Sequence, residues 1–584
     1  MSVIAGALIL SRSTDLLAQV STEIRRHISR GPDAITEFTG PSYYLAKIDV
    51  GAFDAPAAHR DAEGNVSLLA GEPLLRERSP GVYTNRQTDL MHLHSQWSRG
   101  DWSGLQECTG TFCAVNYVRE ASRIALIGDK LGLRPIYYWV TPEVLIFATA
   151  LRILEQIRMV RLDLDLRGVT EAAAFGSPLG ERSPYVEIST IGAGQIVQVS
   201  VKGVEKSFYW RWDRVPPVEK DIREVAREAR QAFLAAVDRR LRGETTAVAF
   251  LSGGLDSRVI ASVLVERGVA LHTLNHAPEE TQDRVFADDI ATVLGTKHHH
   301  VSPDLRSMYA FRARVWNQGA VGRWFDSERG VDGRRRVVWS GDGGSVGVGH
   351  VYLNEEIVKR ARSGDVDAAI DAFLSHNRHR VNPRLFRSDI ATSVARMPKV
   401  GVKEELNRLD CRDPGRAFHL FLMLNDQRRH MANLYENIDQ DRIELQLPFF
   451  DNDFLALILA CPLDGFLGHS FYMRWLEHFP PVVTSRAWQA YPGHVPCPHP
   501  IPEGLRYQWE NPFSKRALDE SKRTLLQEMD RFMKSPAFPR AILNRSALRI
   551  AHWLTRLGVR DYGYVLKMAI TYCRYAAGGG RWGG

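Results

Sequence analysis

The stretch AFLSGGLDSRV, residues 249–259, decides the fold class of this chain. An apolar run ends at Leu251, two glycines follow, and apolar residues at helical spacing continue beyond Arg258. A strand that passes through a glycine turn directly into a helix is typical of parallel α/β sheets, which bind ligands at the carboxyl ends of their strands. We therefore expect a parallel sheet with its ligand site at this turn.

The residue types in the turn indicate a phosphate ligand together with a metal ion. Backbone N–H groups and the dipole at a helix start attract anions, and the hydroxyls of Ser252 and Ser257 can donate to phosphate oxygens. Asp256 would repel phosphate unless a divalent cation lay between them. The turn therefore predicts Mg-ATP or Mg-pyrophosphate, and a Walker-type loop is excluded because the chain has no Gly-Lys dipeptide. The expected nucleotide-binding residues here are Leu251, Ser252, Gly253, Gly254, Leu255, Asp256 and Ser257.

The pattern along the chain predicts two domains. Up to about residue 206, short β-like runs alternate with turn signals, which is typical of a two-layer sheet domain; the runs lie at 3–10, 43–50, 111–118, 123–129, 135–140, 144–150 and 194–201. A linker with a Pro-Pro pair follows at 209–220. Beyond it, helices at 221–241 and 281–294 alternate with strands at 245–251, 269–276 and 335–340, and helical spacing dominates from 354. We expect domains at 1–210 and 211–584.

Composition excludes several classes of protein. The net charge of +7 on 584 residues comes from dispersed basic residues, so no nucleic-acid partner is expected. The six cysteines show neither a CxxC pair nor zinc spacing, and no apolar run is long enough to span a membrane. The opening MSVIAGALIL lacks the basic residues of an export signal, so we expect a cytoplasmic protein. The triplet at 298–300 is interpreted as satisfied or exposed histidines, because consecutive strand residues point to opposite faces.

Several motifs resemble those of one family. SGGLDS is similar to the pyrophosphate loop of the N-type ATP pyrophosphatases, and MSVIAG, RGPD (30–33), GDKLGLRPIYY (128–138), WSGDGG (339–344) and RIELQLPFFD (442–451) resemble segments of asparagine synthetases. The resemblance implies an α/β plus α+β fold. An N-terminal glutaminase-like (Ntn-type) two-sheet sandwich would precede an adenine-nucleotide α-hydrolase-like parallel sheet with helical additions. It also implies ATP and Mg²⁺ as cofactors, with Gly341, Asp342 and Gly343 in a second nucleotide loop.

Three departures from the family pattern bear on the chemistry. Ser2 stands where the glutaminases have their nucleophilic Cys, and Lys47 stands near the position of a glutamine-binding Arg, so we expect a vestigial amidotransferase domain. Ser345 replaces a magnesium-binding Asp, which leaves Asp342 as the second expected metal ligand beside Asp256. In β-lactam synthetases the position of Asp342 holds the Tyr of a catalytic dyad, so a catalytic role for Asp342 stays open.

The third departure removes a cation. Trp488 replaces the family lysine that stabilises the adenylate, and we expect Arg486, or else Arg428 or Arg429, to offset the phosphate charge.

The segments 425–451 and 487–500 look most like those of the lasso peptide macrolactam synthetases. This resemblance implies a precursor peptide substrate, whose Asp or Glu side chain is adenylated and then attacked by the peptide's own α-amine. A leader peptidase and a leader-recognition protein are the implied partners. Glu444 is the expected general base, with Glu436 as the fallback, and the aromatic, Pro-rich stretch 488–509 is expected to hold the threaded tail. The alternatives are another amide ligase, of the asparagine or β-lactam synthetase type, and a catalytically silent homologue.

Overall fold

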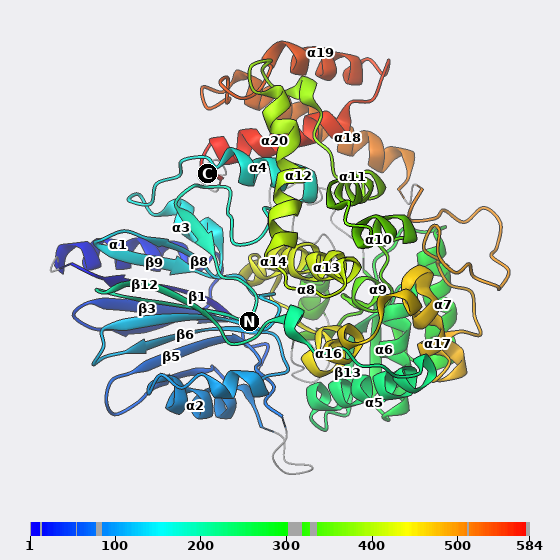
Figure 1. Cartoon of the computed structure of the whole chain (residues 1–584), viewed down its shortest axis with the longest axis horizontal. Coiled ribbons are helices and arrows are strands. Elements are labelled where there is room, and N and C mark those ends of the chain that lie inside the picture. The colour runs from blue at the N-terminus through cyan, green and yellow to red at the C-terminus, as the bar shows by residue number, and fades with distance from the viewer. Residues whose placement is uncertain are drawn as a thin grey trace.

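Two six-stranded antiparallel sheets lie face to face in the first part of the chain (Figure 1). The structure, a computed structural model, describes residues 2–11, 14–53, 55–76, 84–301, 318–327, 336–510 and 513–579. The first sheet has the order β10 (Ile188–Thr190), β8 (Tyr137–Val140), β9 (Val144–Ala148), β1 (Ser2–Ile9), β3 (Tyr43–Asp49), β2 (Ile35–Thr39). The second has the order β12 (Gly203–Phe208), β11 (Gln195–Ser200), β7 (Arg123–Gly128), β6 (Phe112–Val118), β5 (Val66–Gly71), β4 (Ala58–Arg60).

Apolar side chains from both sheets form the core between them. Ile4 and Leu45 from the first sheet pack in one cluster with Leu68, Val115 and Leu126 from the second. Helix α1 (Thr14–His27) packs against the first sheet and α2 (Arg86–Trp97) against the second, so this part of the chain has four layers. All seven predicted strand runs are strands, whereas both covering helices and strands β2, β4, β5, β10 and β12 were not predicted.

A five-stranded parallel sheet organises the second part of the chain. Its order is β15 (Lys297–His300), β14 (Ala270–Asn275), β13 (Thr246–Phe250), β16 (Val337–Trp339), β17 (Glu444–Gln446). The predicted alternation of strands and helices is confirmed by α5 (Ile222–Leu241), α6 (Leu255–Glu266) and α7 (Gln282–Leu294). Arg335, which begins the last predicted run, lies outside the described residues. Because β13 and β16 are neighbours, the two glycine loops that follow them emerge side by side.

Helices fill the rest of this part. They are α8 (Gln318–Ser327), α9 (Gly344–Gly347), α10 (Glu355–Arg362), α11 (Val366–His376), α12 (Ala391–Asn407), α13 (Pro414–Phe421), α14 (Arg428–Tyr435), α15 (Ile438–Asp441), α16 (Asn452–Ala460), α17 (Ser470–Leu476), α18 (Lys515–Lys534), α19 (Arg545–Arg556) and α20 (Gly563–Ala576). The last three cap the molecule at the top of Figure 1. Of the two remaining helices, α3 (Leu151–Gln156) packs on the first sheet, whereas α4 (Leu166–Phe175) joins this cap, where Tyr572 donates to Thr170 Oγ1 at 2.6 Å. Within the described ranges, no helix has the combined length and apolarity that crossing a membrane requires.

Buried charged side chains connect the two parts. Arg134, at the end of the loop before β8, forms an ion pair with Glu444 of β17, with 2.5 Å between Nη2 and Oε2. Arg428 donates from Nε to the carbonyl oxygen of Gly132 at 3.0 Å, from Nη1 to that of Gly180 at 3.1 Å, and from Nη2 to that of Ile191. The sandwich therefore packs against the parallel-sheet domain through specific polar contacts.

Candidate active site

A cavity of about 440 Å³ opens at the carboxyl ends of β13 and β16. The loop after β13 lines it with Leu251, Ser252, Asp256 and Ser257, and the loop after β16 lines it with Ser340, Gly341, Asp342, Gly343 and Ser345. Two loops that were identified separately in the sequence thus meet at one site. Gly253, Gly254 and Leu255 belong to the same turn but are not among the residues that line the cavity.

Two glycines allow the close packing of this turn. A Cβ atom on Gly341 would lie 2.8 Å from Asp256 Cβ and 2.8 Å from the Ser257 nitrogen, so any side chain there would force the two loops apart. A Cβ atom on Gly253 would lie 2.8 Å from Asp283 Cα. Gly253 therefore allows the turn to approach α7 closely.

Asp256 accepts hydrogen bonds from three donors. Its Oδ2 accepts from the backbone N–H of Ser345 at 3.1 Å and from the Ser345 hydroxyl at 2.5 Å, and its Oδ1 accepts from the Tyr472 hydroxyl. Burial raises the pKa of Asp256 to about 6 against these hydrogen bonds, and the negative charge of Asp342 adds to the rise. Ser345, which stands where the family has a carboxylate, thus holds the carboxylate of Asp256 in place.

Asp342 lies between a hydroxyl and an imidazole. Its Oδ2 accepts from Ser340 Oγ at 2.6 Å, and its Oδ1 is 3.6 Å from His430 Nε2. Burial by itself would raise the pKa of Asp342, but the hydrogen bond and charge of His430 outweigh it and lower the pKa. The same hydrogen bond raises the pKa of His430, which favours an imidazolium.

Two stacked histidines contact the backbone of the loop that follows β16. The rings of His350 and His419 are 3.8 Å apart, and Arg416 Nη1 lies 3.1 Å from His350 Nε2 and 2.9 Å from His419 Nδ1. Because arginine can only donate, both imidazoles accept from it and are neutral. Their other nitrogens then donate to the carbonyl oxygens of Val348 and Val346, each at 3.0 Å. The backbone of the site loop is therefore fixed by buried neutral imidazoles.

The expected base does not lie at this cavity. Glu444 is at the amino end of β17, in register with Val337 at the start of β16, whereas the cavity is at the carboxyl ends of the strands. Its side chain is fully buried against Arg134. The fallback, Glu436, is buried beneath the sandwich, where it accepts from the Tyr137 hydroxyl at 2.6 Å. The structure thus corrects both assignments, because each carboxylate has a partner in the other domain.

The arginines that were expected to replace the family lysine also do not line the cavity. Arg486 is half exposed and faces Asp289 of α7, with 3.3 Å between Nη1 and Oδ1. Arg428 and Arg429 are buried and donate to backbone carbonyls of the sandwich. Trp488 is buried in the core of the parallel-sheet domain, so it does not form part of a wall around a ligand. Among the lining residues that the structure describes, none is Lys or Arg.

Several lining residues were not predicted. They are Phe250, Leu274, His276, Val346, Tyr352, Asp426, Gln427, His430, Leu434 and Tyr491. Asp426 and His430 are four residues apart, a spacing that places side chains on one helix face, and this signal was present in the sequence. Tyr491 comes from the stretch expected to hold a peptide, and its ring lies 4.7 Å from that of Trp509.

The sandwich has its own cluster of charged groups at the start of β1. Ser2 Oγ donates to Asp49 Oδ2 at 2.9 Å, and the same oxygen accepts from Arg86 Nη2 at 2.5 Å. Lys47 Nζ lies 3.4 Å from Asp49 and donates to the carbonyl oxygen of Ala57 at 3.2 Å. Lys47 and Arg86 are each 1% exposed, and both contact Asp49, the carboxylate that accepts from Ser2. Burial lowers the pKa of Lys47 to about 7.

Residues 228–468 match the asparagine synthase family, and residues 75–210 match the glutamine amidotransferase domain. The first range contains both loops of the cavity. The likeness to the asparagine synthase family thus covers the part of the chain that forms the cavity. The expected fold class is confirmed: an Ntn-type, glutamine amidotransferase-like two-sheet domain precedes a parallel-sheet domain.

Two relatives of this chain are named asparagine synthetases. The chain is 24% identical over 224 residues to a putative asparagine synthetase [glutamine-hydrolyzing] 2 of Methanocaldococcus jannaschii, a match that covers 37% of this chain and 43% of the relative. It is 23% identical over 260 residues to asparagine synthetase [glutamine-hydrolyzing] 3 of Bacillus subtilis, covering 40% and 41%. The chain thus spans less than half the length of these relatives. The solved glutamine phosphoribosylpyrophosphate amidotransferase of B. subtilis aligns with 59% of this chain and 77% of its own at 10% identity and a TM-score of 0.24.

Proposed function

We propose that this protein is an ATP-dependent amide ligase that adenylates a carboxylate and transfers the acyl group to an amine. The observation that carries the proposal is the meeting of the two glycine loops at one cavity, beside the start of α6. The hydroxyls of Ser252 and Ser257 are 2.9 Å apart, so one donates to the other and the second is left to donate to a phosphate oxygen. The helix start also attracts phosphate. The cavity volume is in the range of nucleotide and cofactor sites.

The cavity residues fit a bound Mg²⁺. Asp256 and Asp342 both line the cavity, and the charge of one raises the pKa of the other, so a dication between them would relieve their repulsion. Carboxylate oxygens are the ligands that Mg²⁺ prefers. When bound, Mg²⁺ would neutralise phosphate charge as pyrophosphate leaves. With no Lys or Arg among the described lining residues, this neutralisation falls to the metal, to α6 and to His430.

The amine is proposed to come from the acyl substrate itself. A glutaminase would need a nucleophile at residue 2, but the Ser2 hydroxyl donates to Asp49, which also pairs with Lys47 and Arg86. A serine hydroxyl without a base is a poor nucleophile. Ring closure within one peptide needs no ammonia, and holding both ends in one cavity can contribute about 7–11 kcal/mol in favourable cases.

We therefore propose macrolactam formation on a precursor peptide, as in the lasso peptide cyclases. The carboxylate of an Asp or Glu side chain attacks the α-phosphorus of ATP and pyrophosphate leaves; the peptide α-amine then attacks the acyl carbon, the C–N bond forms and AMP leaves. Tyr352 and Tyr491 line the cavity, and Trp509, which is 45% exposed, extends the aromatic surface toward solvent. A leader peptidase and a leader-recognition protein are the proposed partners.

The attacking amine must lose a proton, and Asp426 is placed to accept it. Asp426 lines the cavity and accepts from Gln427 Nε2 at 2.8 Å, which orients its carboxylate. A general base must be within hydrogen-bond reach of the proton that it removes. Asp426 lines the cavity, whereas Glu444 and Glu436 do not.

The test supplies ATP and Mg²⁺ with either a candidate core peptide or aspartate plus an ammonium salt, and it measures pyrophosphate together with the mass of the product. We expect stoichiometric pyrophosphate and a peptide lighter by one water. Pyrophosphate with conversion of aspartate to asparagine would instead favour an asparagine synthetase that uses free ammonia. Absence of pyrophosphate with every peptide and with aspartate would favour a silent homologue.

The proposed loss of glutaminase activity has a separate test. Ser2→Ala should leave peptide ligation unchanged within about twofold, because Ser2 lies in the sandwich and not at the cavity. The measurement compares pyrophosphate release with and without glutamine in both proteins. A glutamine-dependent activity that disappears in Ser2→Ala would contradict the proposal.

A further inference from the structure

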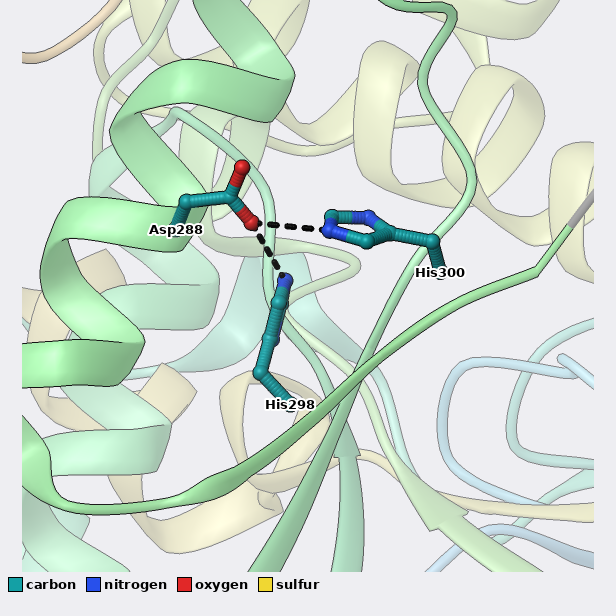
Figure 2. A group of neighbouring side chains, drawn as sticks. All are labelled: Asp288, His298 and His300. Carbon is teal, nitrogen blue, oxygen red and sulfur yellow. Dashed lines mark ion pairs between the residues drawn. The ribbon is translucent and has the colours of Figure 1, made fainter.

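The histidine triplet on the edge strand β15 is divided between two faces. His299 pairs with His272 on one face, with 3.0 Å between ring nitrogens and the rings stacked at 5.2 Å. His298 and His300 lie two residues apart and therefore share the other face. Figure 2 shows both of their rings directed toward the carboxylate of Asp288 on α7. The alternation of side chains along the strand, which argued against a metal site on sequence grounds, in fact brings His298 and His300 together beside Asp288.

The three side chains have the spacing of a metal site. Asp288 Oδ1 is 3.3 Å from His298 Nε2 and 3.0 Å from His300 Nε2, and the three ligand atoms lie within 4.8 Å of one another. Ligand bonds of about 2.0–2.2 Å in a tetrahedral zinc site place neighbouring ligand atoms roughly 3.3 Å apart. Rotation of one imidazole would bring the two histidine nitrogens to that separation.

Hydroxyl groups lie on the far side of His298. Thr273 Oγ1 is 2.7 Å from His298 Nδ1 and 2.8 Å from Thr296 Oγ1, so it can accept from Nδ1 while it donates to Thr296. In this arrangement the proton is on Nδ1 and the lone pair of Nε2 points toward Asp288. A second hydrogen bond of this kind is typical of metal-bound histidines.

His298 Nε2 is buried and, in the described part of the chain, makes no hydrogen bond, although a carboxylate oxygen lies 3.3 Å away. Two electron-pair donors facing each other at this distance repel unless a cation lies near both. Imidazole nitrogen is a ligand that Zn²⁺ and related ions prefer, whereas Mg²⁺ prefers oxygen.

We propose that Asp288, His298 and His300 bind one transition-metal dication of the Zn²⁺ class, with the remaining coordination position open to solvent. Such an ion would connect α7 to the edge of the parallel sheet. None of the three residues is among those that line the nucleotide cavity, so this site is separate from the proposed Mg²⁺ site.

The experiment titrates the full chain, freed of metal with a chelator, with ZnCl₂ by calorimetry and follows thermal unfolding with and without zinc. We expect one equivalent to bind and to raise the unfolding temperature, because an ion that binds only the folded state stabilises it. Asp288→Asn, which keeps the side-chain shape, and His298→Gln should each lose this equivalent. Thr273→Val should weaken binding by about 10–100-fold, as loss of an orienting hydrogen bond does at zinc sites.

His299→Gln is the matched control, because it removes an imidazole from the same strand but from the opposite face. It should bind zinc as the unmodified chain does. The proposal is overturned by zinc binding that persists in Asp288→Asn and His298→Gln, and equally by no binding to the unmodified chain at 100-fold molar excess. Circular dichroism of each variant without zinc separates loss of the site from loss of the fold.

Discussion

Single residues set the charge of the cavity. Asp256, Asp342 and Asp426 contribute three carboxylates, while His430, 53% exposed, is a lining imidazole whose pKa is raised. His276 also lines the cavity, but burial lowers its pKa to about 4, so it is neutral at pH 7. Nucleotide binding should therefore depend more steeply on Mg²⁺ than at sites where lysine or arginine contacts the phosphates.

The first prediction concerns Asp256. Asp256→Asn should lower ATP-dependent pyrophosphate formation by about 100-fold or more, equivalent to about 2.7 kcal/mol, because the amide cannot replace a charged metal ligand. The rate of pyrophosphate release at saturating Mg-ATP measures this.

Tyr472→Phe is the control, because it removes one donor to Asp256 but keeps the carboxylate. It should cost about 1 kcal/mol of stability and leave turnover largely intact. Unchanged turnover in Asp256→Asn would rule out its role as a metal ligand.

The second prediction distinguishes Asp426 from Glu444 as the general base. Asp426→Asn should slow acyl transfer by about 10²–10⁴-fold, the usual contribution of a general base, but should leave peptide-dependent ATP–pyrophosphate exchange in place. Glu444→Gln should lower stability, because Arg134 loses its charged partner, but the folded protein should retain acyl transfer, since Glu444 lies at the opposite end of the strand. Single-turnover measurement of AMP and cyclised peptide distinguishes the steps. The reverse pattern would return the base to Glu444.

At the scale of elements, a π-helical turn at Leu422–Gln427 precedes α14 and supplies cavity residues. Such turns frequently occur at functional sites because the extra residue changes which side chains share a face. Asp426, Gln427 and His430 line the cavity, whereas the neighbouring Arg428 and Arg429 reach the sandwich. One helical segment thus serves both the site and the domain interface.

The third prediction concerns the histidines behind the site loop. Burial, followed by the charge of Arg416, lowers the pKa of His419 to about 3, below the unfolded value near 6.5. The unfolded state therefore binds more protons, so this stabilisation is complete above about pH 6.5 and is lost as pH falls toward 3. The free energy of unfolding should drop by about 1.4 kcal/mol per pH unit from this group.

Urea unfolding between pH 7 and pH 4 measures this dependence. His419→Gln, which keeps an acceptor for Arg416 and a donor for Val346, should show a shallower slope. Equal slopes in the two proteins would mean that His419 takes up its proton in the folded state as readily as in the unfolded state.

The sequence predicted the elements better than their contacts. Strands such as β1 and β6 and the turn at 252–257 were predictable because alternation, apolar runs and glycine turns are local signals. The position of Glu444 was not, because it depends on the register of β17 against β16. The contacts of Arg428 with the sandwich were not predictable either, since their acceptors are 237, 248 and 296 residues away in the sequence.

At the scale of the whole molecule, the sandwich and the parallel-sheet domain share buried ion pairs. Arg134 and Glu444 bury their charges against each other, and Arg30 reaches Asp439 with 2.9 Å between Nε and Oδ2. A buried charge that loses its partner is strongly destabilising, whereas replacing the pair by apolar groups can be neutral.

The fourth prediction follows from this pair. Arg134→Met should destabilise the chain by about 3–5 kcal/mol, because Glu444 would be left charged and buried. The double variant Arg134→Met with Glu444→Leu should regain most of this loss. Thermal unfolding of the three proteins tests the expectation, and a single variant as stable as the parent would contradict it.

The three carbonyl acceptors that Arg428 finds in the sandwich make the parallel-sheet domain dependent on the sandwich. Excising the sandwich would leave a buried guanidinium without these acceptors, and a buried donor that loses its partners destabilises the fold. Residues 211–584 alone should therefore be less stable than the same residues in the intact chain, whatever reaction the sandwich performs.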